Sequence, residues 1–191
     1  ILVPYQHYLR DSVLAGEFPA WNPYASLGRP FAADPQALVW WPGTLVYLVA
    51  GAYLGSFLLV AAHGAWALHA TAAAARRFGA APWAALGAGW AFAFNPKLLG
   101  HLHVGHVQYV VAWLTLPAIV AAALALRDGV NAGRIARLAG PVAWQFLAGA
   151  PQAFWCTALT VALLLAALRL GERGWRPLGR EALAVTAAYA W

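Results

Sequence analysis

Long apolar runs alternate with short polar passages along this chain. Four windows contain no Asp, Glu, Lys or Arg, and they cover residues 35–75, 78–96, 98–126 and 138–168. A helix that crosses a bilayer needs about 20 predominantly apolar residues. The pattern therefore predicts an all-α, polytopic protein: a transmembrane helical bundle with an outer-face loop that carries interfacial helices.

Proline and glycine divide the first window. Residues 55–75 form an uninterrupted apolar stretch that ends at two arginines, as expected of one membrane span. Residues 35–54 are broken by Pro42-Gly43 and Gly51, so they predict an interfacial or re-entrant helix. The aromatic residues suited to the headgroup zone of a bilayer are Trp40, Trp41 and Tyr47.

The last window, residues 138–168, is too long for one ordinary span and short for two. A tight hairpin that turns at residues 149–152 (Gly-Ala-Pro-Gln) keeps the arginines that follow on the same side as the earlier basic clusters. Proline beside glycine favours such a turn. We therefore predict two antiparallel helices in this window.

The basic residues set the expected orientation, because short cytoplasmic loops are enriched in Lys and Arg. Nine of the twelve form three short clusters: Arg76 and Arg77, then Arg127, Arg134 and Arg137, then Arg169, Arg173, Arg176 and Arg180. With all three clusters inside, the spans are 55–75, 80–95, 107–126, the hairpin 138–168 and one more from about Ala182. The chain then divides into an extracytoplasmic loop with an interfacial helix, residues 1–54, and a transmembrane region, residues 55–191.

Composition supports a membrane protein and narrows the partners. The chain is 63% hydrophobic and 9% charged, whereas a typical soluble domain is about 25% charged. The formal charge of +6 does not indicate nucleic acid, because the arginine clusters are explained by topology and by contact with anionic membrane lipids. The single cysteine, Cys156, excludes an internal disulfide and a Cys-based metal site. The chain lacks Met and its last apolar run is incomplete, so we interpret it as part of a longer protein.

Three polar passages share the outer face in this arrangement: the opening loop, residues 95–106 (NPKLLGHLHVGH) and the turn 149–152. In the opening loop, WNPYASLGRPFAADPQ, prolines disfavour helix at the preceding residues, and such a backbone cannot face lipid. One interpretation is a capping loop. The other makes Asp34 a carboxylate at the mouth of a site, with Asn22 and Gln36 as its hydrogen-bonding partners.

The histidine-rich passage leaves three interpretations open. On a helix, His103 and His106 share a face and His101 lies well round the axis, whereas in a loop all three can converge. Imidazoles bind divalent metals, but this cluster lacks an acidic or Cys partner, so no metal site is assigned and a metal cofactor stays an open alternative. The histidines can equally hold a phosphate together with Lys97 and Arg29, or simply end a helix at the membrane boundary. Gln152 of the turn can face the same cavity.

The order of these motifs resembles a known family. Four segments occur in this order: WNPYASLGRPFAADPQALVWWP, RRFG, AFAFNPKLLGHLHVGHVQYVVAWLTLP and FLAGAPQAFW. In their order they are similar to the bacterial YfhO-type membrane proteins and related members of the GT-C glycosyltransferase superfamily. The resemblance covers most of the chain. It implies transfer of a sugar from a polyprenyl-phosphate carrier to a cell-envelope acceptor on the outer face of the bacterial inner membrane. The family's best-known acid would precede Ile1.

Under this hypothesis a carboxylate deprotonates the acceptor hydroxyl, and cationic side chains hold the leaving phosphate. Asp34 is the available candidate for the base. The candidates for substrate binding are Asn22, Arg29, Gln36, Lys97, His101, His103, His106 and Gln152. Two alternatives use the same polar passages without this chemistry: a transporter or flippase of a lipid-linked substrate, and a non-enzymatic membrane assembly protein.

Overall fold

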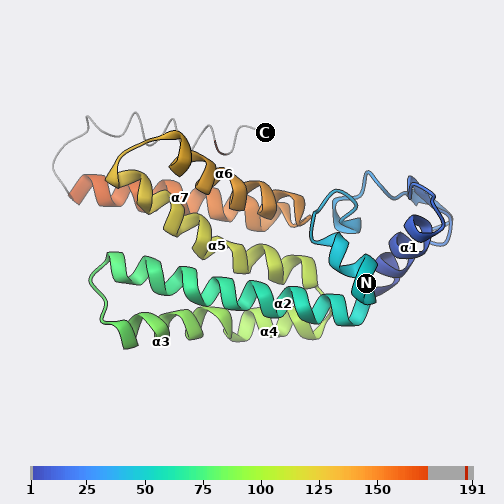
Figure 1. Cartoon of the computed structure of the whole chain (residues 1–191), viewed down its shortest axis with the longest axis horizontal. Coiled ribbons are helices and arrows are strands. Elements are labelled where there is room, and N and C mark those ends of the chain that lie inside the picture. Colours follow the sequence, from blue (N-terminus) through green and yellow to red (C-terminus); the bar gives the residue numbers. More distant parts are fainter. Residues whose placement is uncertain (1, 172–187, 189–191) are drawn as a thin grey trace.

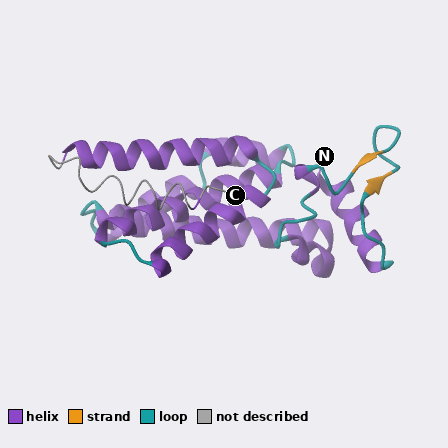
Figure 2. Cartoon of the chain, turned by 90° about the horizontal axis from the view of Figure 1, so that it is seen from above, coloured by secondary structure: helices purple, strands orange, loops and turns teal. Residues whose placement is uncertain are grey.

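The computed structural model describes residues 2–171 and residue 188, and this part of the chain is mostly helical. Figure 1 shows a small lobe at one end of a bundle of longer helices. The lobe contains α1 (Leu2–Leu14), the short antiparallel strands β1 (Trp21–Asn22) and β2 (Arg29–Pro30), and the 3-10 turn η1 (Pro35–Ala37). Figure 2 shows the same lobe beyond the helix ends from a second direction.

Within the described residues, three helices are long and apolar enough to cross a membrane: Thr44–Arg77, Val107–Asp128 and Pro151–Gly171. This finding agrees with a membrane protein. Their outward faces carry exposed large apolar side chains, such as Val49, Phe57 and Leu163, which are 87%, 68% and 61% exposed. Part of the predicted arrangement lies outside the described residues: the further span from about Ala182, and Arg173, Arg176 and Arg180 of the third basic cluster.

Helix α2 (Thr44–Arg77) begins well before the expected span at 55. Its start follows Pro42-Gly43, and Gly51 interrupts it with a φ of 76°, so the two predicted breaks are seen as a helix start and a kink. Two of the three aromatic residues expected to suit the headgroup zone are buried in the protein. Trp41 and Tyr47 are 1% and 0% exposed, because they pack in the core that joins α2 to the later helices.

Helix α3 (Pro82–Ala93) has 12 residues, about 18 Å at 1.5 Å per residue. It is therefore shorter than the expected span 80–95 requires. Residues 95–106, expected as an outer loop, instead contain helix α4 (Pro96–His103), because Asn95 caps its first turn by accepting a hydrogen bond from the Leu98 amide. Helices α3 and α4 follow each other along α2 (Figure 1).

The remaining helices form the other half of the bundle. Helix α5 (Val107–Ala125) ends in the 3-10 turn η2 (Leu126–Asp128), and α6 (Ala132–Leu147) and α7 (Pro151–Gly171) follow. Window 138–168 is thus split into two helices at residues 148–150, which confirms the predicted turn. Buried side chains such as Ile119, Val142 and Val161 join α5, α6 and α7.

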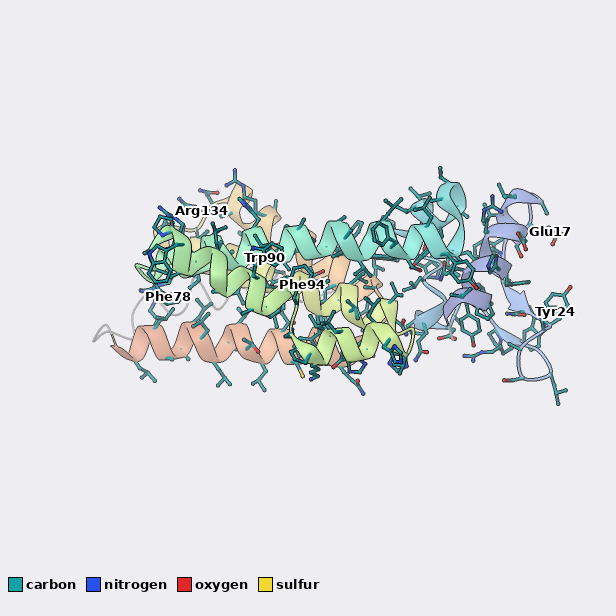
Figure 3. The ribbon with its side chains drawn as sticks, turned by 90° about the horizontal axis from the view of Figure 1, so that it is seen from below. Glu17, Tyr24, Phe78, Trp90, Phe94 and Arg134 are labelled. Carbon is teal, nitrogen blue, oxygen red and sulfur yellow. The ribbon has the colours of Figure 1, made fainter. Side chains whose placement is uncertain are left out.

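The helix ends fall into two groups. The start of α2, the link between α4 and α5, and the link between α6 and α7 lie beside the lobe (Figure 1). At the far end, Arg77 forms an ion pair with Asp128 at 2.5 Å, and Arg134 donates a hydrogen bond to the Gly129 carbonyl. Figure 3 shows Arg134 and Phe78 at that end and Glu17 and Tyr24 at the opposite one.

Candidate functional site

The three polar passages meet in one cavity beside the lobe. The cavity has a volume of about 300 Å³ and draws on four elements: η1, α4, α5 and the start of α7. Its lining residues are Gln36, His101, His106, Gln108, Tyr109, Ala150, Pro151 and Gln152. Residues from three distant parts of the sequence therefore face a common space, and most of their side chains can form hydrogen bonds.

Two Pro-Gln turns hold this cavity together. Gly149 has a φ of +71°, and a Cβ atom placed on it would lie 2.1 Å from the Pro35 carbonyl oxygen. Such a separation is far inside van der Waals contact, so the backbone of the α6–α7 turn packs directly against the start of η1. This contact brings Gln36 and Gln152 to the same cavity.

Asp34 shapes the η1 turn from outside the cavity. One carboxylate oxygen accepts a hydrogen bond from the Gln36 amide at 3.0 Å, and the other accepts one from Arg29 at 2.6 Å. Arg29 also donates to the Tyr5 hydroxyl at 2.9 Å. The arrangement makes Asp34 a helix cap and ion-pair partner that orients Gln36.

His101 and His106 form a direct pair. Helix α4 ends at His103, and Gly105 with a φ of 78° reverses the chain, so that the His106 amide donates to the His101 carbonyl at 2.9 Å. The two Nδ1 atoms lie 3.1 Å apart. The structure thus pairs His106 with His101, whereas helical spacing predicted His103 as its neighbour, because Gly105 breaks the helical periodicity before His106.

The orientation of the pair is that of a hydrogen bond. The ring centroids are 5.5 Å apart, the separation of two imidazoles whose Nδ1 atoms face each other along the line between the rings. One Nδ1 therefore carries a hydrogen and donates it to the other. Within the described residues, no group of three His, Cys, Asp or Glu could hold a metal ion.

Gln108 was not identified from the sequence, and it lines the cavity. Its side chain is 8% exposed, and its Oε1 atom has no hydrogen-bond partner. A buried amide oxygen without a partner costs about 1–3 kcal/mol. The sequence signal was a glutamine two residues after His106, at the start of a mostly apolar stretch. Tyr109 was also missed, and its ring lies against His101 with centroids 3.9 Å apart.

Two long helices begin at the cavity. Helix α5 starts at Val107 directly after His106, and no side chain caps its first turn. Helix α7 starts at Pro151, which lines the cavity with Gln152. Helix N-termini carry a partial positive charge, which favours anions, although at α7 Pro151 has no amide hydrogen and the Ala153 and Phe154 amides donate to the Ala150 carbonyl. None of the Asp and Glu residues in the described part of the chain lines the cavity. No carboxylate in the lining therefore offsets the positive potential of the two helix N-termini.

The other expected binding residues lie elsewhere. Asn22 is buried and accepts a hydrogen bond from the Tyr24 amide within its own turn. Lys97 places its ammonium group 5.2 Å from the centre of the Trp113 ring. His103 is exposed at the end of α4. Together with Arg29 and Asp34, these residues are outside the cavity lining.

A larger apolar groove lies on another face of α4. It has a volume of about 450 Å³ between α2, α3, α4 and α5. Leu98, Leu99 and Leu102 of α4 line it, whereas His101 of the same helix lines the polar cavity. The stacked rings of Trp90 and Phe94 stand beside it (Figure 3).

Comparison of the chain with protein-family models, curated proteins and solved structures gives no match.

Proposed function

We propose that this protein is a multi-pass enzyme of the bacterial inner membrane that transfers a sugar from a polyprenyl-phosphate carrier to a cell-envelope acceptor. The observation that carries the proposal is the polar cavity beside the lobe, where Gln36, the His101–His106 pair and Gln152 meet. The motif resemblance independently names the same three passages. The arginines at the opposite end of the bundle support an extracytoplasmic position for the cavity.

The phosphate of the carrier would bind at the starts of α5 and α7. Backbone amides of a helix N-terminus suit a phosphate oxygen, and the helix dipoles offset its charge. As the bond between sugar and phosphate breaks, negative charge grows on the phosphate, so the same donors would stabilise the transition state more than the ground state. The side-chain amides of Gln36, Gln108 and Gln152 would bind sugar hydroxyls as both donors and acceptors.

The prenyl chain would lie in the apolar groove. The groove and the cavity lie on different faces of α4, so the prenyl chain would run from the phosphate around this helix into the groove. Because the groove and the prenyl chain would both be surrounded by lipid, their association would rest on van der Waals packing and not on transfer of apolar surface from water. This surface contact would supply affinity, while the polar cavity would supply chemical selectivity.

A transfer assay tests the proposal. Membranes that contain the protein are incubated with undecaprenyl phosphate carrying a radiolabelled hexose, and label in cell-envelope polymer is counted. We expect transfer by the wild type and a loss of about 10²-fold in Gln152→Leu, because a mispositioned substrate costs about that factor. His69→Asn, an exposed histidine of α2, is the matched control. Equal transfer by membranes lacking the protein would refute the enzyme, and binding of donor without transfer would favour a transporter.

A further inference from the structure

We infer that the His101–His106 pair is the proton acceptor of the site, with His101 as the catalytic base and His106 as the residue that positions it. This inference rests on the proposed glycosyl transfer. Attack by an acceptor hydroxyl on the sugar requires a group that removes the hydroxyl proton. Within the described lining of the cavity, imidazole is the side chain that can take a proton near neutral pH.

The contact between the rings fixes the protonation pattern. The Nδ1 atoms are 3.1 Å apart and face each other, so one ring donates a hydrogen from Nδ1 and consequently has a free lone pair at Nε2. When that Nε2 takes up a proton, the hydrogen bond to the second ring becomes charge-assisted and stronger. The second imidazole therefore serves the first as a carboxylate serves the histidine of a hydrolase triad.

The surroundings place the charge on His101. His101 belongs to the last turn of α4, where the helix dipole favours a cation, whereas His106 precedes the first turn of α5, where the dipole disfavours one. The Tyr109 ring, with its centroid 3.9 Å from that of His101, also favours a positive charge beside its face. His101 therefore donates from Nδ1 to His106 and accepts the new proton at Nε2.

The step balances without another reactant. The acceptor O–H bond breaks, its proton goes to His101 Nε2, and the acceptor oxygen forms a bond to the anomeric carbon. The bond from that carbon to the phosphate oxygen breaks, and its electron pair leaves with the phosphate. The imidazolium then releases its proton to water or to the departing phosphate, which restores the neutral pair.

Four variants of the full chain test this assignment, each measured for transfer and for binding of undecaprenyl phosphate. His101→Gln keeps a polar group near the Nε2 position but cannot take a proton, so we expect normal binding and a loss of turnover of about 10²–10⁴-fold. His106→Asn keeps an acceptor for the His101 Nδ1 hydrogen and should lose less than about tenfold, whereas His106→Leu should lose more. His103→Asn, exposed on the same helix, is the control.

The outcomes separate this inference from the proposed function. Wild-type turnover in His101→Gln would overturn the base while the glycosyltransferase stands. Loss of undecaprenyl phosphate binding in parallel with turnover would make the pair a phosphate ligand and would also overturn the base. Absence of transfer by the wild type would refute the proposed function itself, and with it the reaction that the pair would serve.

Discussion

Gly149 and Pro35 approach so closely that no side chain fits between them: a Cβ on Gly149 would stand 2.1 Å from the Pro35 carbonyl oxygen. The two residues are far apart in the sequence. Pro35 comes directly before Gln36, and Gly149 comes three residues before Gln152, and both glutamines line the cavity. The contact therefore sets the distance between Gln36 and Gln152. It also joins the lobe to the helix bundle.

Gly149→Ala should break this junction. The substitution adds a backbone clash and places alanine at a φ of +71°, where a left-handed conformation costs about 1–2 kcal/mol by itself. We expect the free energy of unfolding to fall by more than that amount, and binding at the cavity to weaken. Denaturant unfolding in detergent measures the first effect. Gly140→Ala in α6, where a Cβ meets nothing within 4 Å, should be neutral or slightly stabilising.

Gln108→Leu should separate stability from function. The substitution removes a buried oxygen that has no hydrogen-bond partner. We therefore expect the free energy of unfolding to be unchanged or to rise by up to about 1 kcal/mol. We also expect the variant to lose binding of its ligand. Gln145→Leu is the matched control, because Gln145 Oε1 is likewise buried without a partner, whereas its amide nitrogen donates to the Ala112 carbonyl and to the Thr157 hydroxyl at 2.8 and 2.9 Å. That variant should be destabilised by about 1–3 kcal/mol. Lower stability of Gln108→Leu than of Gln145→Leu would contradict this account.

Asp34→Asn distinguishes an orienting carboxylate from a catalytic base. Asn keeps the acceptor for the Gln36 amide but loses the charge that faces Arg29. We expect turnover to fall by less than about tenfold, because the cap persists, with a stability loss of up to about 1 kcal/mol from the lost ion pair with Arg29. A general base would instead be worth about 10²–10⁴-fold in rate. Rate and unfolding are measured on one purified variant, and a loss in the larger range with normal stability would restore Asp34 as the base.

Cysteine labelling tests the orientation in the membrane. In a Cys156→Ala background, Tyr24→Cys in the lobe and Val130→Cys at the arginine-rich end replace side chains that are 88% and 37% exposed. The positive-inside rule predicts that an impermeant thiol reagent labels Tyr24→Cys in intact spheroplasts and Val130→Cys after lysis alone. Labelling of Val130→Cys in intact cells would reverse the assignment and place the cavity inside.

The hydrophobic pattern predicted the long helices, because a charge-free window records directly where a helix can be surrounded by lipid. The turn at Gly149 was also predictable, because proline and glycine affect the backbone conformation at and next to their own positions, whatever the rest of the fold. The burial of Trp41 and Tyr47 was not, because an aromatic residue near a helix end suits both a headgroup zone and a protein core. Only the packing of distant helices decides between them.

The site was predicted in outline and not in its atoms. Charge clusters indicated which passages share one end, and the cavity draws on those passages. The pairing of His101 with His106 depends on the φ of Gly105, which reverses the chain where helical spacing would continue it. Gln108 needed the structure, because a single polar residue in an apolar helix is recognised as part of a site only when its unpartnered oxygen and the cavity beside it are seen.

The central claim is that the cavity recognises the phosphate of a lipid carrier, and thermal unfolding with two matched lipids tests it most directly. Undecaprenyl phosphate and undecaprenol share a hydrocarbon chain and differ in the phosphate. At about 100 times the dissociation constant a ligand stabilises the folded state by about 2.7 kcal/mol. We predict stabilisation of the wild type and of His103→Asn by undecaprenyl phosphate, and little stabilisation of either protein by undecaprenol. Equal stabilisation of the wild type by the alcohol and the phosphate would contradict the claim.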